Sequence, residues 1–485
     1  MGSTMQGVDS PNRLGENAVV LGAGLAGLLA ARVLSEFYDS VCVVERDRLP
    51  NYLCDRKGVP QGQHVHNLLG RGRQILAELF PGLLGELAAA GAVVVDDGDL
   101  SRTYARVGRY EMKRSGRLRD PAPLALYLAS RPFLELHVRR RVNLLPNVTL
   151  LDGHDVVEPV ATGDNVTGVR IVKRDSGFET TIDADLVVDA MGRAARTPAF
   201  LQHLGYGRPT EDRTTAKFGY TSVRLSVPPG CIAEKLVFFN PEAGKPGGLL
   251  VACEHDTWML AIGQLIDMGE PPTDFATMVR MAEQTLPRSI VNGLRLAQPI
   301  GEAATYRHTA AVWRRYDRMP RFPSGLLVIG DALCGLDPTY GQGMTIAALE
   351  ALTLRDCLAS GGSSQLAQRF FAATSRYIGA TWMANQARER VASRPSGRRS
   401  LREWLANWTV RAALNAAAYD VAVTERFMRV FNYIDPISRL QDPALIPRIM
   451  VANLRGLVAR PRSTVTDNGS NDLTTGLAVG VRQGV

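Results

Sequence analysis

The sequence has few cysteines, and they lie far apart: Cys42, Cys54, Cys231, Cys253, Cys334 and Cys357. None forms a Cys-x-x-Cys pair or shares metal-ligand spacing with a histidine, so neither a zinc site nor a disulfide framework is predicted. The chain also lacks the roughly 18 uninterrupted apolar residues of a membrane span and an apolar signal core near its start. We therefore expect a soluble protein of the reducing cytoplasm, with no metal and no stable membrane insertion.

Charge does not point to a nucleic-acid partner. The 485 residues carry a net charge of +8, but the basic residues are dispersed, and no nucleic-acid-binding module is visible. Only the run 388–402 is densely basic, and a solvated helix face explains it equally well. An ordinary basic surface together with an anionic cofactor is the preferred interpretation.

A glycine-rich turn near the N-terminus organises the chain. The apolar run Ala18–Leu21 predicts a buried strand, and residues 25–37 have the apolar spacing of a helix. Between them, Gly22, Gly24 and Gly27 form G-x-G-x-x-G. In such a turn the first glycine permits the bend, the second lets the backbone approach a pyrophosphate, and the third lets helix and strand pack closely.

An acidic residue stands where a dinucleotide fold needs one. Val41–Val44 predicts a second buried strand, and Glu45 at its end can accept hydrogen bonds from a ribose hydroxyl. Arg46 follows directly, and Arg56 and Lys57 are natural partners for phosphate oxygens. Strand, turn, helix and acid together predict a dinucleotide site, and the amides of Ala23 and Ala26 belong to the same turn and helix start.

Three further polar residues have open roles. His64 and His66 invite a catalytic or metal role, but they stand at i and i+2 on a loop without a third ligand, so local hydrogen bonding is preferred. Arg131 opens a helix predicted over 127–142 and could reach a bound nucleotide, although a surface arginine near a helix start is an equal alternative.

A second glycine-punctuated stretch follows the apolar strand at 326–330. Gly330-Asp331 ends that strand, Pro338 and Gly341 shape a loop, and Gly343-Met344 opens a helix to about residue 358. The aspartate can bind sugar-like hydroxyls, and the helix directs its N-terminal amides at whatever lies above it. An intermediate strand, 184–190, ends in Asp189, Met191 and Gly192-Arg193, which can lie beside the same sheet.

The two stretches together resemble FAD-dependent monooxygenases of the p-hydroxybenzoate hydroxylase class, over about residues 17–360. The resemblance implies that the first turn holds the ADP half of FAD and the second holds ribityl and isoalloxazine. It implies cofactor contacts from a group of residues already named and from six others. Those named above are Gly22, Ala23, Gly24, Ala26, Gly27, Glu45, Arg46, Arg56, Lys57, Arg131, Asp189, Gly192, Gly330 and Asp331, and to these it adds Val156, Pro338, Gly341, Gln342, Gly343 and Met344.

A narrower likeness lies in RKGVPQ-x-x-H-x-H, GYTSVRL and DPTYGQGM, which resemble bacterial epoxidases that oxidise polyene polyketides on the way to polyethers. It implies a monooxygenase that uses NADPH or NADH and O2, through a flavin C4a-hydroperoxide, to epoxidise or hydroxylate an apolar small molecule. The backbone of Gly343 and Met344 would stabilise charge at flavin N1/C2=O, with no side-chain nucleophile. The open alternative is a cyclase or cycloaddition catalyst in which FAD is structural. A flavin halogenase is disfavoured because W-x-W-x-I-P is absent.

These inferences predict an α/β fold: a Rossmann-like FAD-binding domain with a parallel sheet, interleaved with an antiparallel-sheet substrate domain, plus a C-terminal helical region. The FAD-binding domain is expected over 17–91, 125–205 and 300–362, and the substrate domain over 92–124 and 206–299. Helices are expected over 363–462, with their aromatics mostly in the core, and disorder over 1–16 and 463–485. In the substrate domain, Phe218, Tyr220, Leu250 and Trp258 are expected to form an apolar cover for the substrate.

Overall fold

The computed structural model describes residues 13–214, 218–240, 245–266, 269–308, 310–393 and 410–458. The segments expected to be disordered therefore lie outside it, apart from residues 13–16. Trp404 and Trp408, two of the aromatics assigned to the C-terminal helices, also lie outside the described residues.

A parallel five-stranded sheet forms the centre of the N-terminal half, in the order β19-β11-β1-β2-β7. Its strands are β1 (Gly15–Leu21), β2 (Tyr38–Val44), β7 (Val148–Leu151), β11 (Leu186–Asp189) and β19 (Leu326–Val328). The parallel sheet at these apolar runs confirms the predicted fold class. Because all five strands run the same way, the chain leaves β1, β11 and β19 at one edge, where the two glycine-rich turns lie.

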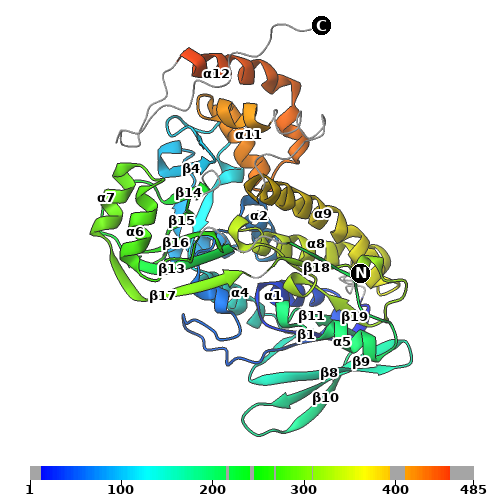
Figure 1. Cartoon of the computed structure of the whole chain (residues 1–485). Helices are drawn as coiled ribbons and strands as arrows, with labels where there is room; N and C mark the ends of the chain where they lie inside the picture. The colour runs from blue at the N-terminus through cyan, green and yellow to red at the C-terminus, as the bar shows by residue number, and fades with distance from the viewer. Residues whose placement is uncertain are drawn as a thin grey trace, which may run out of the picture.

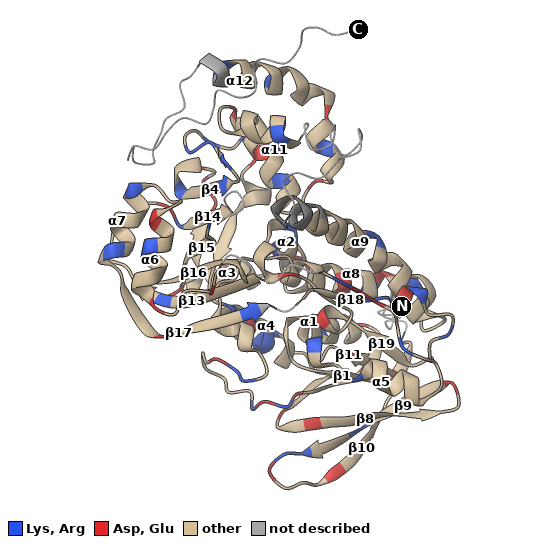
Figure 2. Cartoon of the chain, viewed as in Figure 1, with Lys and Arg blue, Asp and Glu red and all other residues tan. Residues whose placement is uncertain are grey.

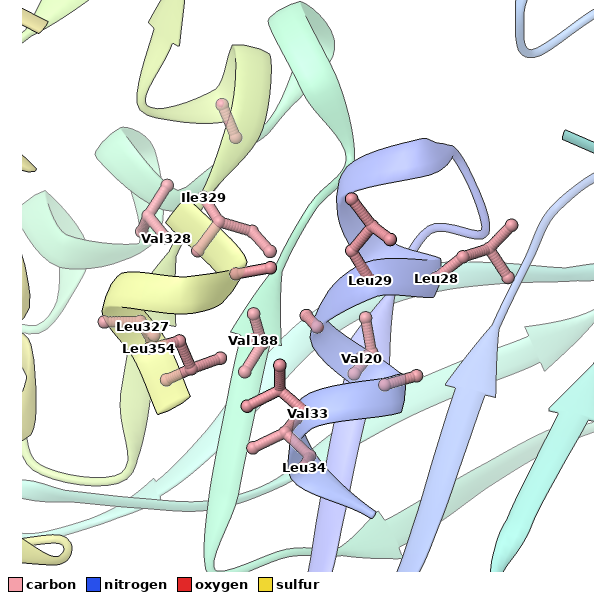
Figure 3. Close-up of a cluster of buried hydrophobic side chains, with 14 of the residues drawn as sticks. Val20, Leu28, Leu29, Val33, Leu34, Val188, Leu327, Val328, Ile329 and Leu354 are labelled. Carbon is pink, nitrogen blue, oxygen red and sulfur yellow. The ribbon is translucent and has the colours of Figure 1, made fainter. Parts of the chain in front are cut away.

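Two helices cover one face of this sheet (Figure 1). Helix α1 (Leu25–Leu34) follows β1, and α8 (Gly343–Gly361) follows β19 through a loop. Leu28, Leu29, Val33 and Leu34 of α1, together with Leu354 of α8, pack against side chains of the strands (Figure 3). These side chains are buried, and their loss of contact with water stabilises the arrangement that holds both helix starts beside each other.

A seven-stranded sheet forms the second layer, in the order β17-β13-β16-β15-β14-β4-β5. Its strands are β4 (Thr103–Val107), β5 (Tyr110–Glu111), β13 (Phe218–Ser226), β14 (Leu236–Asn240), β15 (Gly247–Ala252), β16 (Thr257–Leu265) and β17 (Gln298–His308). All neighbours are antiparallel except β14 and β4. Helices α6 (Phe275–Glu283) and α7 (Arg288–Leu296) cover its outer face.

The sheet corrects one domain boundary. Strand β17 pairs with β13 from Gln298 to His308, so the substrate sheet continues past residue 299, where the sequence analysis ended it. Strand β4 of the segment 92–124 pairs with β14 of the segment 206–299, whereas β3 (Val93–Val95) and β12 (Glu211–Arg213) of these segments belong to other sheets. Apolar alternation alone does not show which sheet an added edge strand joins.

Smaller elements surround the two sheets. They are a three-stranded sheet of β8 (His154–Thr162), β9 (Asn165–Lys173) and β10 (Glu179–Asp183), a second one of β12 (Glu211–Arg213), β18 (Val312–Arg314) and β20 (Cys334–Gly335), and the pair β3 (Val93–Val95) and β6 (Leu126–Leu128). Helices α2 (Gly70–Leu79) and α3 (Leu83–Ala89) are separated at Pro81-Gly82. Helix α5 (Thr197–His203) follows β11.

One predicted helix begins too early in the sequence analysis. Helix α4 spans Arg131–Asn143, whereas residues 126–128 form strand β6. Ser130 caps the helix by accepting a hydrogen bond from the amide of Phe133, and Pro132 at the second position suits a helix start. The expected start at residue 127 was wrong because alternating Leu126 and Leu128 fit a strand as well as a helix.

The C-terminal region is helical, as predicted. It contains α9 (Leu366–Ser393), a short helical segment at 410–417, α11 (Val421–Phe431) and α12 (Ile446–Val458). Helix α9 runs from the region of the parallel sheet toward α11, which lies near β4 (Figure 1). No helix in the described part of the chain is long and apolar enough to cross a membrane.

Candidate functional site

A large cavity of about 2510 Å³ lies where the two sheets and the C-terminal helices meet. Its wall includes both glycine-rich turns, one face of the seven-stranded sheet and parts of α9 and α11. Most of the exposed lining is apolar. A space of this size can hold a dinucleotide and a further molecule, since typical small-molecule pockets are about 300–1,000 Å³.

The three glycines of the first turn have three different environments. Gly22 has φ +102°, which favours glycine, and a β-carbon there would meet the Ala190 carbonyl oxygen at 2.8 Å. A β-carbon on Gly27 would lie 1.9 Å from the Gly22 carbonyl oxygen. Around Gly24, in contrast, a β-carbon would meet no atom within 4 Å, and this residue lines the cavity. The turn is therefore tight on the protein side and open toward the cavity.

Glu45 lies at the end of β2, buried and on the cavity wall. Its Oε2 accepts a hydrogen bond from the Ala23 amide at 2.8 Å, and its Oε1 accepts one from the Asp47 amide at 2.9 Å. Arg56 lies 3.4 Å from Oε2. A carboxylate offers about four lone-pair positions, so Glu45 can hold the glycine turn and still accept a hydrogen bond from a hydroxyl in the cavity.

Arg56 and Lys57 do not contact the cavity, which corrects their expected role as phosphate partners. The Arg56 guanidinium is buried and donates to Glu135 at 2.8 Å, in addition to its ion pair with Glu45. Lys57 is exposed and outside the cavity wall. Arg46 lines the cavity and pairs with Asp155 at 3.5 Å. Sequence spacing could not show that Arg56 faces inward, toward carboxylates on two other elements.

Arg131 lines the cavity, and a buried carboxylate on the same helix holds its side chain. Its Nε donates to Glu135 at 2.7 Å, so Glu135 binds Arg131 and Arg56 together. Burial acts to raise the pKa of Glu135, but Arg131 and Arg56 outweigh it and hold the pKa below its usual range. The expected position of Arg131 beside a cofactor agrees with this geometry, and the buried carboxylate fixes the direction of its side chain.

His66 meets Arg131 from the other side. Its Nδ1 lies 2.9 Å from the His64 carbonyl oxygen and therefore donates, which leaves Nε2 as an acceptor 3.5 Å from the Arg131 guanidinium. Burial and Arg131 lower the pKa of His66 to about 3. His64 contacts Ser222 at 2.9 Å. His66 makes a local hydrogen bond, as preferred from the sequence, whereas the partner of His64 lies on the distant strand β13. His66 also lines the cavity, which was not predicted.

A buried carboxylate connects the substrate sheet to the helix of Arg131. Glu254, in the turn between β15 and β16, accepts hydrogen bonds from the Ser130 amide at 2.7 Å and from its hydroxyl at 2.5 Å. Ser130 is the N-cap of α4. The start of α4 is thus held by the antiparallel sheet as well as by its own cap.

The middle motif shapes a turn. Asp189, fully buried, accepts hydrogen bonds from the Met191 amide at 2.9 Å and from the Thr197 hydroxyl. It does not line the cavity, so its expected cofactor contact is corrected to support of the turn. Gly192, with φ +71°, does line the cavity. Burial raises the pKa of Asp189.

The second glycine stretch surrounds the cavity from Gly330 to Met344. Asp331 lines the wall and pairs with Arg193 at 3.7 Å. Asp337 accepts the Thr339 amide at 2.8 Å and so caps the short turn Pro338–Tyr340, after which Gly341 has φ +63°. The cavity-lining residues of the rest of this loop are Leu336, Pro338, Thr339, Tyr340, Gly341, Gln342, Gly343 and Met344.

Helix α8 starts at this loop without a side-chain cap. A β-carbon on Gly343 would meet nothing within 4 Å. The uncapped N-terminus therefore opens into free space, where its amides and the positive end of the helix dipole can stabilise negative charge. Helix α1 has the same property, because its N-cap is Gly24.

The expected substrate residues divide into two pairs. Phe218 and Tyr220 of β13 line the cavity. Leu250 and Trp258 do not: both are buried on the opposite face of the sheet, packed with α6 and α7. Successive residues of a strand face opposite sides, and the neighbour Leu249 lines the cavity instead. Leu250 and Trp258 are core residues.

The C-terminal region contributes more to the cavity than expected. Phe427, Phe431 and Tyr433, assigned to the core with the other aromatics, line it, whereas Trp382 is in the core. Phe431 packs against Phe238 of β14 with ring centroids 5.9 Å apart. Aromatics at i and i+4 on a helix indicate a buried face, but this pattern does not distinguish a core from a cavity wall.

Comparison with known proteins decides the family. A family model described as an FAD binding domain matches residues 16–365. The chain belongs to this FAD-binding family. It is 37% identical over 455 residues to Protein Rv3254 of Mycobacterium tuberculosis, a match that covers 91% of this chain and 94% of that protein.

Two other similar proteins have monooxygenase names. Kynurenine 3-monooxygenase of Salinispora arenicola is 28% identical over 371 residues, with 72% of this chain and 73% of the relative covered. The crystal structure of p-nitrophenol 4-monooxygenase PnpA from Pseudomonas putida has the same fold, with a TM-score of 0.60 and 17% identity, and the likeness covers 87% of this chain and 98% of that one. These findings support the predicted flavin monooxygenase class and FAD as the cofactor.

FAD fits the residues present. The two open glycine positions, Gly24 and Gly343, lie at uncapped helix starts suited to phosphate and to flavin oxygen. Glu45 and Asp331, both on the wall, are acids suited to sugar and ribityl hydroxyls. Val156 of β8 also lines the cavity and would add an apolar contact to the bound cofactor.

Proposed function

We propose that this protein is an FAD-dependent monooxygenase that uses NADPH or NADH and O2 to epoxidise or hydroxylate an apolar natural-product intermediate, of the polyketide type. The observation that carries the proposal is the meeting of both glycine turns at one cavity whose remaining wall is mostly apolar and includes one face of the seven-stranded sheet. FAD held there would take up electrons from the nicotinamide and activate O2 for transfer to the substrate.

The protein's own contribution is positioning and electrostatics. The amides near Gly343 and Met344, at the start of α8, would stabilise negative charge at the flavin N1/C2 carbonyl. Glu45, Gly24 and Asp331 would hold the remaining parts of the cofactor. Arg131 supplies a fixed positive charge, because Glu135 holds its guanidinium.

Aromatic side chains line the substrate side of the cavity and would limit the access of water. Phe218 and Tyr220 of β13, with Tyr306 of β17, form an aromatic wall. A dry site protects activated oxygen until it reacts with substrate. Within the described residues, no group of three or more His, Cys, Asp or Glu side chains is arranged to hold a metal, and the proposal does not need one.

Anaerobic reduction tests the proposal. FAD-loaded protein is mixed with NADPH or NADH, and the flavin absorbance is followed. We expect bleaching that substrate accelerates, followed in air by incorporation of one atom of labelled dioxygen into product. A flavin that neither nicotinamide reduces, with or without an extract of a strain lacking this protein, would instead favour the structural-flavin cyclase alternative. Colourless protein that does not take up added FAD would exclude both.

A further inference from the structure

A row of cavity-lining residues crosses the seven-stranded sheet from β13 to the edge strand β5. The end of the row at β13 is here called the inner end, and the end at β5 the outer end. In the strand register, Gly263 of β16 pairs with Tyr220 of β13 and with Gly247 of β15. Val107 of β4 pairs with Asn240 of β14 and with Tyr110 of β5. All of these residues line the cavity. With strands about 4.8 Å apart, the five steps from β13 to β5 span roughly 24 Å.

The two ends of this row differ in chemistry. The ring of Tyr220 packs edge-on against His64 with centroids 4.8 Å apart, and the His64 carbonyl oxygen contacts His66, the neighbour of Arg131. The inner end therefore lies beside the proposed flavin position. Between the ends the wall is apolar, with Ala105, Leu249 and Phe238 on the sheet side and Phe431 opposite. These residues thus form the wall of an elongated apolar path that leads away from the proposed flavin position.

The outer end is basic. Arg109 and Lys113 flank β5, Lys245 precedes β15, and Arg411 begins the helical segment at 410–417; all four line the cavity. Backbone hydrogen bonds connect these segments, since the Gly108 amide donates to Asn240 and the Lys113 amide donates to Ala417. Lys and Arg also gather around the end of β4 beside α11 in the charge view (Figure 2).

These cations lack acidic partners in the part of the chain that the structure describes. No ion pair there involves Arg109, Lys113, Lys245 or Arg411, although Arg109 stacks on Tyr110. The acids of the cavity wall are already engaged by arginines or backbone amides: they are Glu45, Asp155, Glu158, Asp331, Asp337 and Asp435. Positive charge is therefore available to a ligand at the outer end.

In the sequence, the basic run 388–402 stands between two cavity-lining residues. Residues 388–402 contain six arginines and one acid. Ala384, just before this run, and Val410, shortly after it, both line the cavity.

We infer that the substrate is an elongated apolar molecule that ends in an anionic group, a carboxylate or a phosphate, and that the cluster Arg109, Lys113, Lys245 and Arg411 binds this group while the apolar end reaches the flavin side. The inference rests on the proposed function for the reacting end, but the binding of the anion can be measured without turnover. It assigns substrate orientation to residues far from the reacting atoms.

The test is equilibrium binding to FAD-loaded protein by titration calorimetry. The probes are palmitate, hexadecanol and palmitoyl-coenzyme A, which share an apolar chain and differ in the head group. We expect an anionic probe to bind more tightly than hexadecanol, with an affinity that falls as salt rises. Preference for palmitate identifies a carboxylate site, and preference for palmitoyl-coenzyme A a phosphate site. Equal binding of all three would overturn the inference.

Variants locate the effect. In Arg109→Gln/Lys113→Gln, the dissociation constant of the preferred anionic probe should rise about threefold to tenfold, because each partly exposed charge contact contributes little. Hexadecanol binding should not change. Arg288→Gln/Arg318→Gln removes the same charge from exposed positions outside the cavity and should leave both constants unaltered. Equal losses in the two double variants would assign the effect to net charge and contradict the site.

The two proposals fail separately. If the flavin is reduced by NAD(P)H but the head groups do not matter, the anion site is wrong and the monooxygenase proposal stands. If anion-selective binding is found in protein whose flavin is never reduced, the site stands and the monooxygenase proposal is wrong.

Discussion

Gly330 lies directly against Ala26. A β-carbon on Gly330 would come within 2.8 Å of the Ala26 β-carbon, although more than 300 residues separate the two positions in the chain. The second glycine turn therefore packs on the first turn of α1. The contact brings the two halves of the proposed FAD site to one place.

This contact predicts the effect of Gly330→Ala. The new methyl group must displace Ala26, and the residue must keep φ +63°, so we expect a loss of about 1–3 kcal/mol in the free energy of unfolding and weaker FAD binding. Gly163→Ala is the matched control, because Gly163 has φ +60° and open space around its β-carbon. Denaturant unfolding and flavin absorbance measure both. Equal losses in the two variants would mean that φ, not the contact, limits position 330.

Gly24 and Gly27 should respond in opposite ways to alanine. Gly24→Ala adds a methyl group to open cavity space, so the stability of the FAD-free protein should be unchanged while FAD affinity falls by about tenfold or more. Gly27→Ala forces a carbon against the Gly22 carbonyl oxygen and should destabilise the FAD-free protein itself. Thermal unfolding with and without FAD separates the two. Unchanged FAD affinity in Gly24→Ala would show that the phosphates of FAD do not bind at this turn.

The neighbours Leu249 and Leu250 test the assignment of the sheet faces. Leu250→Ala leaves a hole in the core beneath α6 and α7 and should cost about 2–5 kcal/mol of unfolding free energy, with substrate KM unchanged well below the unfolding temperature. Leu249→Ala should cost much less stability and alter substrate binding, because Leu249 faces the cavity. Urea unfolding and steady-state kinetics give the comparison. The reverse pattern would place the cavity on the other face.

Glu350 predicts a pH dependence of stability. It is buried in α8 and its Oε2 accepts the Gly330 amide at 2.6 Å. Burial raises its pKa from the usual 4.5 to about 8. Between these values the folded protein holds a proton that the unfolded chain has lost, so the free energy of unfolding should fall as pH rises from about 4.5 to about 8 and then level off. Glu350→Gln should remove this fall. Unfolding curves at several pH values measure it, and a wild-type curve parallel to that of the variant would show that Glu350 is ionised throughout.

Much of the fold followed from local pattern. The run before Gly22 is apolar at every position from Ala18 to Leu21, as a strand buried on both faces requires, and the structure places it at the centre of the parallel sheet. The roles of Gly22, Gly24 and Gly27 were also predictable, because backbone geometry near a tight turn depends on a few adjacent residues.

The remaining features depend on distant residues. Nothing near Arg56 in the sequence indicates Glu135 as its partner, so its burial could not be predicted. The orientation of Leu250 depends on the strand register, because the residues before and after it, Leu249 and Val251, are also apolar. The cavity-facing position of Phe427 and Phe431 depends on how α11 packs against β4 and β14, which helical periodicity does not specify.

The hydrogen bonds of Glu254 to Ser130 have a mechanical consequence. The hairpin tip of the substrate layer and the first turn of α4 act as one rigid joint, and Arg131 is the next residue along. A displacement of this hairpin turn is therefore expected to shift the start of α4, where Arg131 lies. The position of the turn between β15 and β16 is in this way connected to the position of the cavity-lining guanidinium of Arg131.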